Sequence, residues 1–173
     1  DRDGWLTRWQ EDRIQFHVDK VNPILDRYVD RLLPEGFGRV LVPLCGKSVD
    51  LGWLVDRGHE VVGVELAEKA VEDLFKELGR SPTISTQDVF QSWRSDGLEV
   101  LVGDLFELDA EFIGKFDAIW DRAALVALRP SDRDRYAPHL REFLQSNGHI
   151  LLCTISYDES KMEGPPFSVC ADE

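Results

Sequence analysis

The chain has 173 residues, which is the length of a single domain, and we expect one domain over residues 1–173. Its 33 acidic residues outnumber its 20 basic residues, and the net charge of −13 argues against nucleic acid and anionic membrane surfaces as partners. The three cysteines form no CxxC pair and have no histidine at ligand spacing. This pattern argues against disulfides and a metal site, and it favours a cytoplasmic location. The sequence shows no signal peptide and no apolar run of membrane-spanning length.

The first 37 residues predict one or two amphipathic helices, because apolar residues recur at helical spacing until Pro34. This segment also carries three large aromatic residues, Trp5, Trp9 and Phe16. These rings have two interpretations. They could pack the helix onto the core, as most buried aromatic residues do, or they could form a lid over a pocket.

The stretch from residue 39 to residue 65 predicts a strand, a sharp loop, a short helix and a second strand. Residues 40–44 and 61–64 are continuous apolar runs, as in buried parallel strands. Between them, Ser48 is placed to cap a helix over residues 49–57, and Gly58 ends it. A further helix is expected over residues 66–78.

The remaining chain predicts three more strands, over residues 98–103, 116–120 and 148–156. Residues 80–97 are polar and indicate a loop with at most a short helical turn. A helix is expected over residues 132–144, with Ser131 as its cap and Pro138 as an internal irregularity. This order predicts an α/β fold of the Rossmann-like type, with a mostly parallel sheet of five strands and helices on both faces.

In such a sheet, ligands bind beyond the carboxyl ends of the strands. The residues at these five positions are Leu44 to Gly46, Glu65, Asp104 with Leu105, Asp121 with Arg122, and Tyr157 with Asp158. Each could alone be a helix cap or a solvated charge. Together they predict a binding site at this edge of the sheet.

The first of these loops, PLCGKS, argues for a nucleoside ligand without phosphates. Glu65 follows Gly46 by nineteen residues, the spacing of an acid that binds the hydroxyl groups of a ribose, although it could also cap the next helix. The loop has one glycine where a dinucleotide needs GxGxxG, and Leu41 stands where a phosphate loop needs its first glycine. A nicotinamide-dependent oxidoreductase is therefore disfavoured, and S-adenosylmethionine is the expected cofactor.

Four segments resemble the thiopurine S-methyltransferase family of S-adenosylmethionine-dependent methyltransferases. The segments are Trp5…Trp9…Phe16-His17, PLCGKSVDLGWLVDRGHEVVGVE, IGKFDAIWDRAALVAL and LLCTISYDESKMEGPPF. The resemblance implies that Trp9, Leu44, Glu65 and Arg122 contact the cofactor, with Trp5, Gly46, Asp104 and Leu105 in the same pocket. It also implies that Phe16 and Arg122 meet the substrate.

The same resemblance implies a class I methyltransferase sheet of seven strands, of which the last two form an antiparallel pair. Because only five strands are predicted and the chain ends at Glu173, these C-terminal strands are expected to be missing. The fifth predicted strand would then have an open edge. Members of the family generally act as monomers, and a monomer is expected here.

The implied reaction is direct, in-line transfer of the methyl group from S-adenosylmethionine to the sulfur of an aromatic or heterocyclic thiol, with Arg122 favouring the thiolate. The alternatives are a non-catalytic module that binds the cofactor, or methylation of selenium or tellurium compounds or of another small thiol. Cys45 could act as a nucleophile but fits a tight structural turn better. His17 could accept a proton or simply pack as a histidine.

Overall fold

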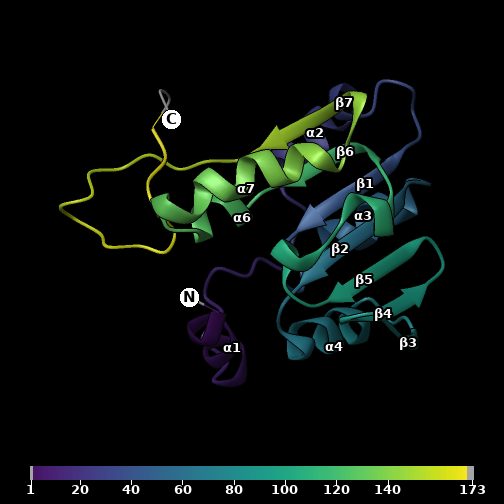
Figure 1. Ribbon diagram of the computed structural model, residues 1–173, viewed down its shortest axis with the longest axis horizontal. Coiled ribbons are helices and arrows are strands. Elements are labelled where there is room, and N and C mark those ends of the chain that lie inside the picture. The colour runs from purple at the N-terminus through teal and green to yellow at the C-terminus, as the bar shows by residue number, and fades with distance from the viewer. Residues whose placement is uncertain (1, 171–173) are drawn as a thin grey trace.

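A computed structural model describes residues 2–170 as a seven-stranded sheet with helices on both faces (Figure 1). The strand order is β3-β4-β5-β2-β1-β6-β7. The strands are β1 (Arg39–Pro43), β2 (Glu60–Glu65), β3 (Thr83–Gln87), β4 (Phe90–Ser95), β5 (Leu98–Val102), β6 (Phe116–Asp121) and β7 (Leu144–Leu152). The predicted α/β class is confirmed.

The five strands β5, β2, β1, β6 and β7 are parallel, while β4 is antiparallel to both β3 and β5. The chain first builds outward from β1 through β2 and then returns to place β6 on the other side of β1. The strand order therefore reverses between β1 and β6, and ligands bind at such a switch point. Figure 1 shows the arrowheads of the parallel strands pointing toward the side where α1 and the C-terminal segment lie.

The helices are α1 (Arg2–Gln10), α2 (Pro23–Leu32), α3 (Asp50–Asp56), α4 (Glu68–Glu77), α5 (Ala110–Ile113), α6 (Ala124–Ala127) and α7 (Pro130–Glu142), with a 3-10 turn, η1, over Leu105–Glu107. Side chains of β1 alternate between the two layers that these helices form. Val40 and Val42 pack with α2, α3 and α4, while Leu41 packs with α7 on the opposite face. None of the helices within residues 2–170 is both long and apolar enough to traverse a lipid bilayer.

The prediction of a loop over residues 80–97 is wrong. This segment forms the hairpin β3–β4, which raises the number of strands from the predicted five to seven. The side chains of β3 are mostly exposed, so the strand has no apolar face that a periodicity search could detect. The connecting turn contains Asp88 with φ 55° instead of the glycine that usually marks a hairpin. On β4, Phe90 and Trp93 are buried and hold the hairpin against the core.

The antiparallel strands therefore lie at the β3 edge of the sheet and precede β6 in the chain. At the opposite edge of the sheet, β7 pairs only with β6 among the described residues. This strand covers residues 144–152, so it begins and ends earlier than predicted. Its exposed side chains include Ile150 and Leu152.

Helix α7 begins at Pro130, and Ser131 is not its cap, because the capping position is Arg129 and makes no side-chain hydrogen bond there. Proline suits the first turn because its missing N–H has no helical partner in any case. Pro138 lies inside α7 as predicted. For α3, the capping position is Val49 and not the predicted Ser48, although Ser48 Oγ accepts a hydrogen bond from the Asp50 amide at 3.3 Å.

Candidate functional site

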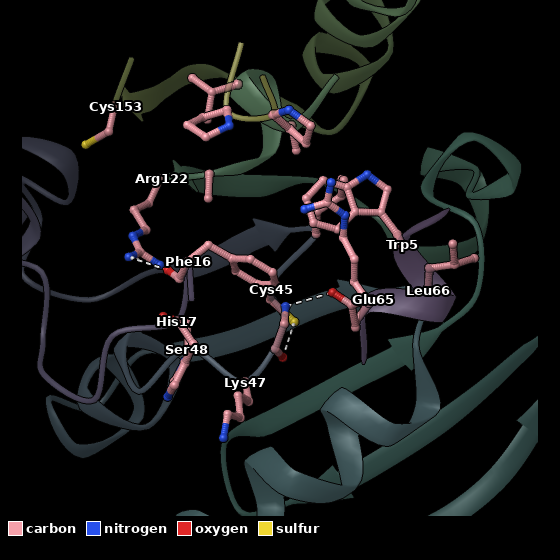
Figure 2. Close-up of a pocket in the computed structure, with 18 of the residues that line it drawn as sticks. Trp5, Phe16, His17, Cys45, Lys47, Ser48, Glu65, Leu66, Arg122 and Cys153 are labelled. Carbon is pink, nitrogen blue, oxygen red and sulfur yellow. Dashed lines mark hydrogen bonds between the residues drawn. The ribbon is translucent and has the colours of Figure 1, made fainter. Parts of the chain in front are cut away.

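A cavity of about 420 Å³ opens at the carboxyl ends of β1, β2, β6 and β7, at the switch point of the sheet (Figure 2). A cavity of this volume falls within the usual range for small-molecule sites, about 300–1,000 Å³. Its lining comprises Trp5, Arg8, Trp9, Phe16, His17, Leu44, Cys45, Gly46, Lys47, Ser48, Glu65, Leu66, Arg122, Ala123, Val126, Ala127, Cys153, Thr154, Ile155, Pro165 and Pro166.

The loop after β1 turns into the cavity through two residues with left-handed backbone conformation. Leu44 has φ 46° and Gly46 has φ 53°. A Cβ atom added to Gly46 would meet the Trp9 ring at 3.0 Å, so the glycine allows both the turn and the close approach of the ring. The Cys45 amide donates to the Val64 carbonyl at 3.0 Å and fixes the loop to β2.

Glu65 fixes the same loop from the end of β2. Its Oε2 accepts from the Gly46 amide and its Oε1 accepts from the Ala67 amide, each at 2.8 Å. Burial raises the pKa of this carboxyl, while the backbone N–H donors of Ala67, Gly46 and Leu66 act in the opposite direction. Ala67 occupies the capping position of α4, so Glu65 binds the backbone just before this helix and is not its cap. Each carboxylate oxygen keeps a further lone pair, so ligand binding is compatible with this role.

Three aromatic rings form one wall of the cavity. The Phe16 ring meets Trp5 and Trp9 edge-on, with centroid distances of 5.6 Å and 5.7 Å. The Arg8 guanidinium lies 5.2 Å from the centre of the Trp5 ring. Figure 2 shows Phe16 between Trp5 and Arg122, and the Phe16 carbonyl accepts a hydrogen bond from Arg122 Nη2 at 3.4 Å. The N-terminal segment is thereby tied across the cavity to the end of β6.

The lining is cationic although the chain is strongly acidic. It contains Arg8, Lys47 and Arg122 but only one acid, Glu65. Lys47 Nζ is held 2.7 Å from Oε1 of Glu77 on α4. The concentration of positive charge favours an anionic group inside the cavity, where the low dielectric strengthens the attraction.

His17 lies in the same part of the lining, and its Nε2 is 4.0 Å from the other oxygen of Glu77. Burial lowers the pKa of this imidazole from its usual 6.5, and the positive charges of Lys47 and Arg122 lower it further. Glu77 and Asp19 oppose this shift. The net direction keeps the ring neutral at physiological pH.

Asp121, at the end of β6, holds the wall formed by α6. Its carboxylate accepts from the Tyr136 hydroxyl at 2.7 Å and from the amides of Ala124 and Leu125 at 3.0 Å and 3.2 Å. Burial raises the pKa of Asp121 despite these donors. The sequence placed Asp121 at a strand end but did not predict this network, because Tyr136 comes from α7.

The segment after β7 closes another side of the cavity. The Phe167 amide donates to the Val126 carbonyl at 2.7 Å, and the Tyr157 hydroxyl donates to the Pro166 carbonyl at 2.6 Å. These bonds bring Pro165 and Pro166 into the lining. The GPPF motif was a sequence signal for this region, but no role had been predicted for it.

Most predicted site residues line the cavity, namely Trp5, Trp9, Phe16, Leu44, Gly46, Glu65 and Arg122. Two do not. Asp104 accepts from the Phe106 amide at 3.0 Å and caps η1, and the Leu105 side chain is buried in the core. Arg8, Lys47 and Leu66 line the cavity although sequence reasoning had not selected them. Arg8 lies on the same short helix as Trp5 and Trp9, and for Arg8 this proximity was the one sequence signal of a place in the cavity.

Cys45 is buried beneath the loop, and burial and the nearby Glu65 carboxylate raise the pKa of its thiol. A thiol with a raised pKa stays protonated at neutral pH, and a protonated thiol is a poor nucleophile. The geometry therefore supports the structural interpretation of this residue.

Comparison with known proteins identifies one family over the whole chain. A sequence model described as "Thiopurine S-methyltransferase (TPMT)" matches residues 1–173. A protein named thiopurine S-methyltransferase from Pseudomonas aeruginosa (strain LESB58) is 47% identical over 171 residues, which cover 99% of this chain and 78% of that protein. The protein of the same name from Azotobacter vinelandii is 47% identical over 167 residues, which cover 96% of this chain and 77% of that protein.

Solved structures support the fold. A Burkholderia thailandensis 1,6-didemethyltoxoflavin-N1-methyltransferase, with bound 1,6-didemethyltoxoflavin and S-adenosylhomocysteine, matches with a TM-score of 0.64 at 18% identity. The match covers 91% of this chain and 62% of that chain. The glycopeptide N-methyltransferase MtfA in complex with sinefungin matches with a TM-score of 0.62 at 20% identity, over 84% of this chain and 58% of the other. The chain thus spans less than two thirds of either structure.

Proposed function

This chain belongs to the thiopurine S-methyltransferase family of S-adenosylmethionine-dependent methyltransferases, and we propose that it methylates the sulfur of an aromatic or heterocyclic thiol. The observation that supports this acceptor class best is the composition of the cavity. Flat aromatic side chains line one wall, and cations outnumber acids in the lining of an otherwise acidic protein. Such a site suits a planar molecule that carries negative charge on sulfur.

The cavity residues fit S-adenosylmethionine. Glu65 presents a buried carboxylate at the end of β2, where an acid binds the two hydroxyl groups of a ribose. The loop at Leu44 and Gly46 has no phosphate-binding pattern, which agrees with a nucleoside that has no phosphates. Trp5 and Trp9 would cover the cofactor, and Asp104 with Leu105 remain predicted contacts near its adenine.

When bound, the cofactor supplies an electrophilic methyl group on its sulfonium. The protein's contribution is to hold the acceptor sulfur in line and to keep water out. Phe16 would cover the acceptor from the N-terminal side, and we propose that residues 1–37 act as a lid. Arg122 would hold the acceptor as its anion, because a nearby guanidinium stabilises a thiolate.

We predict that Arg122→Ala lowers kcat/KM for an ionised acceptor more than for a protonated one. With 4-nitrothiophenol, which is ionised at neutral pH, we expect a loss of about tenfold, equivalent to about 1.4 kcal/mol of lost charge interaction. With benzyl mercaptan, which is protonated, the loss should be smaller. Arg129→Ala is the matched control, since Arg129 is exposed and lies outside the cavity lining. Equal losses for the two acceptors would contradict the proposed role of Arg122.

Two measurements on the same protein distinguish a methyltransferase from a non-catalytic module that only binds the cofactor. Isothermal titration calorimetry with S-adenosylmethionine measures binding, and mass spectrometry of the reaction with 6-mercaptopurine measures S-methylation. We expect both binding and turnover. Cofactor binding with no methylation of any aromatic thiol would favour the non-catalytic module instead.

A further inference from the structure

The imidazole of His17 lines the cavity beside the cations that attract an anionic acceptor. We propose that His17 is a catalytic base that removes the proton from a thiol acceptor, and that the acceptors therefore include thiols that are still protonated at neutral pH. This inference rests on the proposed methyl transfer to sulfur. It adds a residue and an acceptor class to that proposal.

The backbone holds His17 in place at the cavity. Its amide donates to the Ile14 carbonyl at 2.8 Å, and the preceding carbonyl, that of Phe16, accepts from Arg122. The His17 side chain is only 15% exposed. Figure 2 shows His17 and Arg122 on the same side of the cavity, so an acceptor sulfur near Arg122 would also be near the imidazole.

The surroundings of the ring suit a base. Glu77 places one oxygen 4.0 Å from Nε2 and binds Lys47 through its other oxygen at 2.7 Å. Within the described residues, neither ring nitrogen of His17 makes a hydrogen bond. In the tautomer that carries its proton on Nε2, toward Glu77, Nδ1 is free to accept a proton. The Glu77 carboxylate would then stabilise the imidazolium that forms, as a carboxylate does behind a catalytic histidine.

The other candidate proton acceptors in the lining are less suitable. Both oxygens of Glu65 already accept backbone hydrogen bonds. Burial raises the pKa of Cys45 and of Cys153, so each stays a protonated thiol that cannot take up a second proton. Arg8, Lys47 and Arg122 are cations and have no free acceptor. His17 is the neutral nitrogen base of the cavity.

The proposed step is a proton transfer from the acceptor sulfur to His17. The S–H bond of the acceptor breaks, its electron pair stays on sulfur, and the proton moves to Nδ1 of His17. The resulting thiolate lies near Arg122, and the imidazolium lies near Glu77. Methylation of a thiol releases one proton in total, and His17 passes this proton to solvent when the product leaves.

The first experiment measures kcat/KM for wild type, His17→Asn and His149→Asn with two acceptors. His149 is the matched control, because it is an exposed histidine on β7 outside the cavity lining. At one pH unit below the pKa of benzyl mercaptan, about a tenth of this thiol is ionised, so H17N should lose about tenfold with it. With 4-nitrothiophenol, which needs no base, H17N should change by less than about twofold. Equal losses for both acceptors, or no loss, would overturn the proposal.

The pH profile gives a signature that a structural role would not produce. In wild type, kcat/KM for benzyl mercaptan should fall below pH 6.5 as the imidazole is protonated, because burial, Lys47 and Arg122 lower the pKa of His17. In H17N the break that belongs to the imidazole should disappear, and kcat/KM should instead fall about tenfold per pH unit from the pKa of the thiol downward, as the free thiolate concentration does. Glu77→Gln removes a charge that raises this pKa, so it should move the limb to lower pH. An acid limb unchanged in H17N would contradict the assignment.

A binding measurement without turnover completes the test. Benzyl mercaptan is added to the complex with S-adenosylhomocysteine, and the ultraviolet absorbance of the thiolate is recorded. We expect a larger fraction of the bound thiol to be ionised with wild type and H149N than with H17N, while calorimetry shows unchanged S-adenosylhomocysteine affinity. Identical thiolate signals would overturn the role of His17 alone. Failure of wild type to methylate either thiol would instead overturn the proposed function.

Discussion

Glu65→Ala is expected to weaken the binding of S-adenosylmethionine by about 100-fold or more. Two charge-assisted hydrogen bonds to a ribose would be lost, each contributing about 1.5–3 kcal/mol. The substitution also removes the acceptor of the Gly46 and Ala67 amides, so the loop after β1 loses its link to β2. Calorimetry with S-adenosylhomocysteine measures the affinity, and thermal unfolding measures how far the loop change destabilises the fold.

Two further variants separate the charge of Glu65 from its shape. Glu65→Gln keeps the shape but offers one acceptor oxygen, so one of the two amides would face an NH₂ group and affinity should still fall. Glu68→Ala, the same change at an exposed position in the first turn of α4, should bind the cofactor like wild type. Near-normal affinity in E65A would remove Glu65 from the predicted cofactor contacts.

The pH dependence of cofactor binding tests the same carboxylate. Burial raises the pKa of Glu65 above its usual 4.5, so protonation begins at a higher pH than for an exposed acid. Because the ionised form accepts hydrogen bonds from both ribose hydroxyls, affinity should fall as the pH drops through this raised pKa. The E65Q variant should show no such dependence. A wild-type affinity that stays constant to pH 4.5 would contradict the prediction.

The central part of the fold was predictable because its strands are buried on both faces. Residues 40–44 and 61–64 are uninterrupted apolar runs, and the observed strands β1 and β2 differ from these ranges by one residue at each end. A strand that is apolar throughout can be recognised without any periodicity. The same reasoning placed Glu65 and Arg122 at strand ends, which meet at one edge of a parallel sheet.

The hairpin β3–β4 was missed for the opposite physical reason. β3 lies at the sheet edge with its side chains mostly exposed, so hydrogen bonding to β4 defines it and apolar burial does not. The relation of His17 to Glu77 could not be predicted either. These residues are 60 positions apart, on the N-terminal segment and on α4, and only the packing of α1 beside α4 brings the two segments together. Sequence spacing informs about neighbours within one element, whereas this pair depends on tertiary structure.

The buried network of Asp121 explains how Arg122 is held at the cavity. The carboxylate of Asp121 caps the short helix α6 and binds the Tyr136 hydroxyl of α7, while the Asp121 carbonyl accepts from the Cys153 amide at 2.8 Å. Three segments that line or support the cavity thus meet at one residue. The position of Arg122 depends on this arrangement, since it directly follows Asp121 at the end of β6.

Asp121→Ala is therefore expected to destabilise the protein by about 3–5 kcal/mol, because two buried donors and one partly buried donor would lose their acceptor. Chemical denaturation at neutral pH measures this difference. Tyr136→Phe removes one of the three hydrogen bonds and should cost about 1–2 kcal/mol. Asp109→Ala is the matched control. Asp109 caps α5, a helix as short as α6, but it is exposed, so its loss should cost about 1 kcal/mol.

The pH dependence of this difference has a defined sign. Burial raises the pKa of Asp121 in the folded protein, so the folded state binds the proton more tightly than the unfolded chain does. The stability from this tighter binding is present at low pH and is lost as the pH rises through the raised pKa. The gap between wild type and D121A should therefore widen as the pH falls from 7 toward 3.8, the usual pKa of the group. A gap that narrows with falling pH, or a D121A variant no less stable than D109A, would show that this carboxylate does not hold the wall of the cavity.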